Sequence, residues 1–241
     1  MRRIINPFII LYHISVFIPI AIVTTIICAT ATCVMIPIWG DKRWGYYPGM
    51  IWAKILCTTA LVRVRAEGRE HVSPDSTYVF TANHQSIFDV FLVYGWLGTK
   101  FRWVMKKEIR HIPFIGKACE MMGHIFIDRS NAVAAKKSIE AAERRLKSGG
   151  SIFIFPEGTR TKDGAVGKFK RGAFVMARDL QLPVVPATIA GAYEVMPYHS
   201  WLIHPGTIRL IIHHPIEASL MDEERMNLTI AQIRNTIASS L

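Results

Sequence analysis

The sequence has little cysteine, and none of it is arranged as a ligand pair. Its four cysteines are Cys28, Cys33, Cys57 and Cys119. Because no CxxC spacing occurs, a disulfide framework or a paired-cysteine zinc site is excluded by pattern, and the apolar surroundings indicate small core residues in a reducing compartment. The adjacent His213 and His214 do not replace such a site, because neighbouring side chains of a strand face opposite sides of a sheet. We therefore expect no metal and no cofactor.

Charge is absent from one long stretch near the start of the chain. Residues 4–40 contain no Asp, Glu, Lys or Arg and consist mainly of Ile, Val, Phe, Leu and small residues. At about 1.5 Å per helical residue, this run is longer than a hydrocarbon core of roughly 30 Å requires. Hydrophobic residues make up 51% of the whole chain. The sequence predicts an N-terminal membrane-embedded helical segment within residues 1–61.

Three prolines leave the form of this segment open. Pro7, Pro19 and Pro37 each remove one backbone hydrogen bond, which kinks or ends a helix. Either residues 20–36 form one spanning helix with an irregular lead-in, or the segment is a broken, re-entrant hairpin within one leaflet. A cleaved signal peptide fits less well, since the run exceeds the usual apolar core of roughly 7 to 15 residues. Basic residues flank the run on both sides and do not orient it.

Positive charge is concentrated in the middle of the chain. The formal net charge is +11, and residues 100–171 hold 17 lysines and arginines against 7 aspartates and glutamates. A basic surface next to a membrane segment predicts attraction to anionic lipid headgroups. Nucleic acid is the competing partner, but no helix-turn-helix, zinc-finger spacing or aromatic RNA-binding motif accompanies the charge. We therefore expect membrane lipids, and no nucleic acid, as partners.

From residue 62 onward, strand-like and helix-like stretches alternate. Strands are predicted at 78–82, 101–105, 124–127, 152–155, 184–190 and 207–213. Helices are predicted at 50–61, 90–97, 113–122, 131–148 and 171–179, and a last one carries its apolar residues Met226, Ile230, Ile233 and Ile237 on one face. The alternation predicts an α/β domain over residues 62–241, with a mixed, largely buried β-sheet flanked by helices.

A histidine and an aspartate stand five residues apart where the strand at 78–82 ends. Within one continuous helix, His84 and Asp89 would point about 140° apart, so a pair requires His84 on a turn and Asp89 in the following helix. Asp89 would then hold one ring nitrogen while the other takes a proton from a hydroxyl. Two alternatives remain open: a structural histidine that caps the helix, and a Ser86 nucleophile, which lacks the usual GxSxG elbow.

A proline-glycine turn with polar residues follows the strand at 152–155. Gly158 permits close backbone approach, Thr159 offers a hydroxyl, and Arg160 offers a planar fork of donors suited to phosphate. The spacing is not that of a Walker P-loop, so we expect no nucleotide hydrolysis. Arg129, after the strand at 124–127, is a further candidate phosphate ligand. The alternative for both positions is a solvated basic loop.

In chain order these strand ends read NHQSIFD, FIDR, FPEGTR and VVP. With this combination and order, residues 62–216 resemble the glycerolipid acyltransferase family, specifically the 1-acyl-sn-glycerol-3-phosphate acyltransferases. Thr161 stands where many members have serine, and it keeps the hydroxyl.

The resemblance implies general-base catalysis without a covalent acyl-enzyme. His84, held by Asp89, would deprotonate the sn-2 hydroxyl of lysophosphatidate, which then attacks an acyl thioester, either acyl-CoA or acyl carrier protein, to give phosphatidate. It also implies which residues hold the glycerol phosphate: Arg129, Glu157, Gly158, Thr159 and Arg160. Backbone amides for the oxyanion would lie near the histidine turn or at the Gly158 turn.

Acyl thioesters are available in the cytoplasm, so we expect an integral or monotopic membrane enzyme whose catalytic domain lies on the cytoplasmic side. An acyltransferase for another lysolipid or for glycerol 3-phosphate is the first alternative. A non-catalytic membrane-binding protein and a lipid hydrolase that uses Ser86 are the others.

Overall fold

A single β-sheet lies at the centre of the computed structural model, which describes residues 7–39, 44–128 and 150–241. Seven strands are hydrogen-bonded in the order β1-β7-β6-β2-β5-β3-β4. They are β1 (Val62–Glu67), β2 (Val79–Ala82), β3 (Phe101–Lys106), β4 (Ile125–Ile127), β5 (Ser151–Ile154), β6 (Val184–Ala190) and β7 (Gly206–Ile212). Neighbours pair in parallel except β6 and β7, which are antiparallel. The predicted mixed sheet is confirmed.

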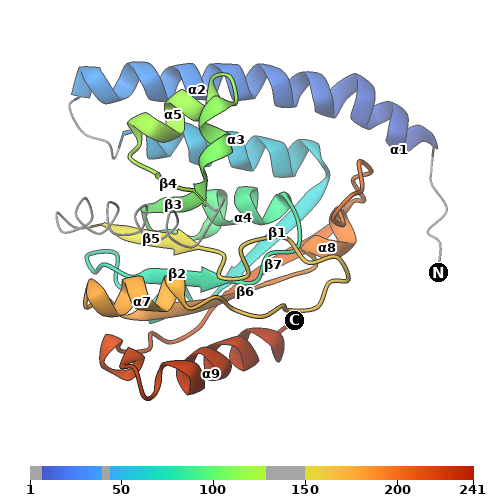
Figure 1. The fold of residues 1–241 in the computed structure, drawn as a ribbon. Coiled ribbons are helices and arrows are strands. Elements are labelled where there is room, and N and C mark those ends of the chain that lie inside the picture. Colours follow the sequence, from blue (N-terminus) through green and yellow to red (C-terminus); the bar gives the residue numbers. More distant parts are fainter. Residues whose placement is uncertain (1–6, 40–43, 129–149) are drawn as a thin grey trace.

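Helices cover both faces of this sheet (Figure 1). On one face lie α3 (Tyr46–Thr59), α4 (Phe88–Trp96) and α5 (Ile115–Met121), and on the other lie α7 (Gly172–Asp179) and α9 (Met226–Ala238). The short α8 (Ala192–Val195) precedes β7. Because both faces are covered, all residues of β2, β5 and β6 are buried.

Alternation along the strands divides the core into two apolar clusters. In β2, Phe80 joins the cluster under α3 and α4, whereas its neighbour Val79 joins the cluster with Phe174 of α7 and Ile233 of α9. Successive side chains of a strand point to opposite faces, so one strand supplies both clusters. Because the side chains on both faces of these strands are buried, the strands stand out in the sequence as continuous apolar runs.

Within the described residues, each predicted strand and helix has an observed counterpart, and the short helix α8 was not predicted. Strand β1 adds to them: its residues alternate between inward Val62, Val64 and Ala66 and more exposed charged side chains. Helix α3 begins at Tyr46, earlier than residue 50, because a proline such as Pro48 is tolerated in a first helical turn. The helix predicted at 131–148 lies outside the described residues.

The N-terminal apolar run forms one uninterrupted helical stretch, Pro7–Trp39. It comprises α1 (Pro7–Tyr12), a π-helical segment (His13–Phe17) and α2 (Ile18–Trp39). A proline ring clashes with the carbonyl four residues earlier, and for Pro19 that residue is Ser15, which lies in the wider π-helical segment. The predicted break is not seen within residues 7–39, and the π-helical segment is the irregularity that lies ahead of α2. By length and composition this stretch is able to cross a membrane.

The apolar helix lies along the α/β domain on the same side as α3 (Figure 1). Helices α3 and α5 pack against α2. Phe17 and Ala21 contact the apolar cluster that lies under α3 and α4. Trp52 of α3 donates its indole N–H to the hydroxyl of Thr25 at 2.8 Å. The predicted domain boundary between residues 61 and 62 stays a prediction, and α3 packs its buried Leu56 into the core of the α/β domain.

Candidate active site

The two principal sequence motifs meet at one edge of the sheet. His84 follows β2, and the segment Phe155–Arg160 follows β5, the parallel neighbour of β2. The carboxyl ends of adjacent parallel strands lie side by side, so motifs far apart in the sequence come together there. The backbone N–H of Thr161 donates to the carbonyl of His84 at 2.8 Å and joins the two segments directly.

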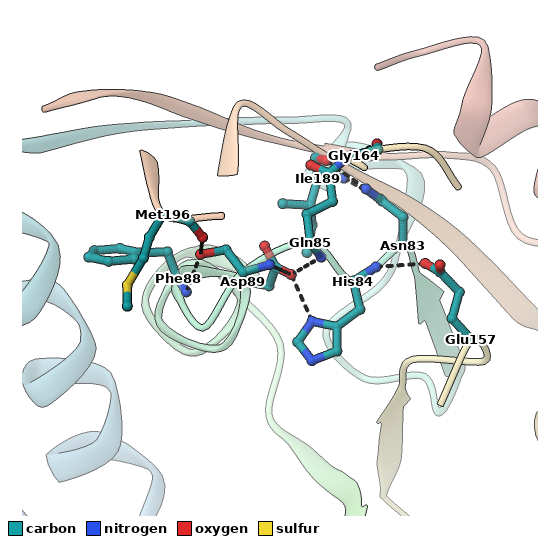
Figure 2. A network of polar contacts seen from close by, with 10 residues as sticks. Asn83, His84, Gln85, Phe88, Asp89, Glu157, Gly164, Ile189 and Met196 are labelled. Atoms are coloured by element: carbon teal, nitrogen blue, oxygen red, sulfur yellow. Dashed lines mark hydrogen bonds and ion pairs between the residues drawn. The ribbon is translucent and has the colours of Figure 1, made fainter. Parts of the chain in front are cut away.

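The His84 ring is oriented by a buried carboxylate. Its Nδ1 lies 2.7 Å from Oδ2 of Asp89, which is fully buried in the first turn of α4 (Figure 2). A carboxylate at this distance favours the tautomer with the proton on Nδ1, which leaves Nε2 as the acceptor. Among the residues that the structure describes, none bonds Nε2. The predicted turn-and-helix arrangement of the pair is confirmed, while its catalytic role stays a prediction.

An aromatic ring fixes the plane of the same imidazole. Phe155 stacks on His84 with ring centroids 3.9 Å apart and an interplanar angle of 6°. Trp103 of β3 lies behind Phe155, with centroids 5.5 Å apart, and is itself buried. The ring of His84 is therefore held at its edge by Asp89 and on one face by Phe155.

Glu157 binds backbone amides on two different segments. Its carboxylate is buried, Oε1 accepts the N–H of His84 at 2.8 Å, and Oε2 accepts the N–H of Gly167 at 2.8 Å (Figure 2 shows the first contact). Burial raises the pKa of Glu157, and the two amide hydrogen bonds oppose this rise. The geometry thus gives Glu157 a part in positioning His84, whereas its predicted part in binding substrate is untested.

The Gly158 turn lies beside a hollow of about 320 Å³. Gly158 has a φ of +77°, a left-handed conformation that glycine adopts without strain. The lining residues are Glu157, Thr159, Arg160, Thr161, Asp163, Ala165, Val166, Gly167 and Lys168. The Arg160 guanidinium also lies over the ring of Tyr198, 4.7 Å from its centroid. The structure therefore brings Glu157, Thr159 and Arg160 to one hollow, while Arg129 lies outside the described residues.

The hydroxyl of Ser86 is not directed at the histidine. Ser86 is fully buried and donates its hydroxyl hydrogen to the carbonyl of Met196 at 2.8 Å. Its backbone N–H donates to Asp89 at 2.8 Å. A nucleophile must share a hydrogen bond with its base. The hydrolase hypothesis therefore finds no support in the geometry.

Several residues that build the site carry no chemical signature in the sequence. Asn83 bonds both backbone groups of Ile189 in β6, each at 2.8 Å, and so fixes the end of β2. Gln85 donates from Nε2 to the carbonyl of Gly164 at 2.7 Å. The signals available in the sequence were their positions beside His84 in the NHQ motif. Gly167, in contrast, had no signal, because it acts through a backbone amide.

Comparison with known proteins identifies the family. A family model described as Acyltransferase matches residues 63–190, which include both motifs of this site. The chain belongs to the acyltransferase family. This confirms the resemblance seen in the sequence.

Similar proteins cover most of the chain. The chloroplastic 1-acyl-sn-glycerol-3-phosphate acyltransferase of Arabidopsis thaliana is 35% identical over 202 residues, which are 83% of this chain and 55% of that protein. A 1-acyl-sn-glycerol-3-phosphate acyltransferase of Cocos nucifera is 31% identical over 214 residues, or 88% and 68% of the two chains. The chain thus spans little more than half the length of the Arabidopsis relative.

A solved family member has the same fold. The crystal structure of the 1-acyl-sn-glycerophosphate acyltransferase of Thermotoga maritima superposes with a TM-score of 0.82 at 27% identity. The match covers 98% of this chain and 96% of that one, and so includes the N-terminal helices as well as the α/β domain.

Proposed function

We propose that this chain is a membrane-associated 1-acyl-sn-glycerol-3-phosphate acyltransferase. The observation that supports it best is the His84–Asp89 pair, whose Nε2 is left as an acceptor at the sheet edge that also carries the basic Gly158 turn. The printed names of the relatives in Arabidopsis and Cocos agree with this activity. The apolar helix Pro7–Trp39 agrees with a lipid substrate that is presented in a membrane.

In the proposed reaction, His84 acts as the general base. Nε2 takes the proton of the sn-2 hydroxyl while the hydroxyl oxygen forms a bond to the thioester carbon. The carboxylate of Asp89 stabilises the imidazolium that results. The carbon–sulfur bond then breaks, the imidazolium returns its proton to the thiolate, and phosphatidate and a free thiol are released. No covalent acyl-enzyme is needed.

Backbone amides for the oxyanion are better supplied by the Gly158 turn than by the histidine turn. The amide of His84 is bonded to Glu157, and those of Gln85 and Ser86 are bonded to Asp89. The amide of Gly158 donates to the carbonyl of Phe155. Within the described part of the chain, the amides of Thr159 and Arg160 make no hydrogen bond, so they remain available as donors.

The glycerol phosphate would bind in the hollow beside this turn. Arg160 offers bidentate donors and Lys168 a second positive charge, and both line the hollow. Charge-assisted hydrogen bonds to a phosphate are about twice as strong as those between neutral groups. Arg129 is a further expected ligand. The acyl donor is a thioester of CoA or of acyl carrier protein, and the catalytic domain faces the cytoplasm, where these donors occur.

The test uses purified full-length protein with lysophosphatidate vesicles and either acyl-CoA or acyl carrier protein thioester. Thiol release and phosphatidate, identified by mass spectrometry, are expected with at least one donor. His84→Ala should abolish both signals, whereas His111→Ala, a change at an exposed histidine, should leave them unchanged. Absence of phosphatidate with either donor would contradict the proposal. Faster acylation of glycerol 3-phosphate than of lysophosphatidate would contradict the proposed acceptor.

A further inference from the structure

The C-terminal helix α9 contacts the site through one arginine. Arg234 donates from Nε to the carbonyl of Gly167 at 2.9 Å and from Nη2 to the carbonyl of Val166 at 2.6 Å. Val166 is buried in the same apolar cluster as Ile233 and Ile237, the α9 residues that flank Arg234. Helix α9 lies beyond residues 63–190, the segment that the family model matches.

The hydrogen bonds continue from this arginine to the backbone of His84. Gly167, whose carbonyl accepts from Arg234, donates its own N–H to Oε2 of Glu157, and Oε1 of Glu157 accepts the N–H of His84. A Cβ at Gly167 would lie 2.7 Å from Oε2 of Glu157, so the Glu157 carboxylate would have to move away from the Gly167 amide. The path from Arg234 to His84 therefore depends on close approach between a backbone amide and a carboxylate.

The histidine turn and the loop at 161–168 are also joined independently of Glu157. Thr161 donates its N–H to the carbonyl of His84, and Gln85 donates to the carbonyl of Gly164 (Figure 2 labels Gln85 and Gly164). The loop and the turn thus form one hydrogen-bonded unit. Arg234 connects this unit to α9, which is packed on the far face of the sheet (Figure 1).

We propose that Arg234 is a positioning residue for acyl transfer. By holding the carbonyls of Val166 and Gly167, it places the Gly167 amide against Glu157, and Glu157 in turn places the backbone of His84. The position of Nε2 relative to the substrate hydroxyl follows from that backbone. The kinetic part of this inference rests on the proposed function, whereas the structural coupling does not.

The contact requires a guanidinium and not only a positive charge. Its planar fork bonds two carbonyls at once, whereas the ammonium of lysine is a single point on a flexible stem. Loss of the fork leaves two carbonyls of the loop without this donor, and the loop is expected to shift. A displacement of about 1 Å at a catalytic group can lower a rate about a hundredfold.

Arg234→Met and Arg234→Lys in the full-length protein test the inference, with Arg225→Met as the control. Arg225 stands immediately before the same helix, and its guanidinium bonds the exposed side chain of Asp222 instead of the loop. The activity-independent readout is amide hydrogen exchange, followed by mass spectrometry, over residues 83–86 and 163–168. Exchange should accelerate in both segments in Arg234→Met and stay unchanged in Arg225→Met.

The kinetic readout separates positioning from substrate binding. For Arg234→Met we expect kcat to fall about 10- to 100-fold, with KM for lysophosphatidate changed less than about twofold. The kcat of Arg234→Lys should lie between that of Arg234→Met and that of the wild type. A raised KM with unchanged kcat would mean that Arg234 binds the substrate phosphate and would overturn the inference. A lowered Tm with unchanged kcat and unchanged exchange at residues 83–86 would assign it a purely structural role.

Gly167→Ala tests the same path without touching the arginine, and decides the matter if Arg234→Met does not fold. It should lower kcat to a similar extent, and the Arg234→Lys/Gly167→Ala double variant should lose no more than the larger single loss. Fully additive losses would contradict the path. If the wild type itself fails to acylate lysophosphatidate, the proposed function fails, and the exchange measurements still decide whether Arg234 positions His84.

Discussion

Asp89 Oδ2 contacts His84 Nδ1 and, at the same time, two backbone amides of the turn that precedes helix α4. The oxygen lies 2.7 Å from Nδ1, and it also accepts the backbone amides of Gln85 at 2.6 Å and Ser86 at 2.8 Å. One buried carboxylate therefore closes the turn that presents the histidine and orients its ring. The turn and the orientation of the base cannot vary independently.

This arrangement predicts the effect of Asp89→Asn. The asparagine amide lacks the negative charge that stabilises an imidazolium, and it no longer selects the Nδ1–H tautomer. We expect kcat to fall about 10³- to 10⁴-fold, by analogy with the same change in a catalytic triad. Steady-state rates with a saturating thioester measure this loss. Asp179→Asn, at an exposed aspartate that pairs with Arg178, should keep wild-type activity. Equal rates in Asp89→Asn and wild type would contradict the general-base mechanism.

The aromatic stack on His84 predicts a loss of activity in Phe155→Leu. Leucine fills most of the volume but cannot stack flat on an imidazole, an interaction of roughly 0.5–1.5 kcal/mol. We expect kcat to fall about tenfold with a small change in the free energy of unfolding. Phe174→Leu is the matched control, because Phe174 is fully buried in the apolar cluster on the other face of the sheet and stacks on Phe169. This control should lower the free energy of unfolding and leave kcat of the folded fraction unchanged. If the control lowers kcat and Phe155→Leu does not, the role of Phe155 is contradicted.

Burial of Glu157 predicts a pH dependence of stability. Because burial raises its folded-state pKa above the unfolded value, despite the amide bonds from His84 and Gly167, the folded protein binds the proton more tightly. The associated stabilisation is fully present below the unfolded pKa and is lost as the pH rises through the folded pKa. Denaturation across this window should show the wild type losing stability, relative to Glu157→Gln, as the pH increases. A difference that is constant with pH would contradict the raised pKa.

The left-handed turn at Gly158 predicts a cost for alanine there. Gly158→Ala imposes a positive φ on a residue with a side chain, which costs about 1–2 kcal/mol, and its Cβ would lie 2.9 Å from Nζ of Lys170. Thermal unfolding should show the loss of stability. The rate of acyl transfer should also fall, because Thr159 and Arg160 of the same turn line the hollow proposed to bind the glycerol phosphate. Gly95→Ala is the control: this helical glycine of α4 has room for a Cβ at 3.4 Å from Lys54, and the substitution should stabilise the protein by about 0.5–1 kcal/mol. Equal effects of the two substitutions would contradict the strain at residue 158.

The sequence by itself determined the alternation of strands and helices from residue 78 onward. Apolar periodicity is a local property, and strands such as β6 that are buried on both faces stand out as continuous apolar runs. Strand β1 was not predicted, because its short alternation of valines and arginines is a weaker signal than a continuous apolar run. Spacing also placed His84 on a turn and Asp89 in a helix, because only that arrangement lets side chains five residues apart meet.

Only the tertiary structure decided what surrounds the base. Glu157 and His84 are 73 positions apart, and Arg234 and Gly167 are 67 apart. Their contacts use backbone amides and carbonyls, which every residue carries and no sequence pattern distinguishes. Such contacts exist only after parallel strands have brought their carboxyl ends to one edge and α9 has packed beneath them. The His84–Asp89 pair is thus encoded locally, whereas its placement is a property of the folded chain.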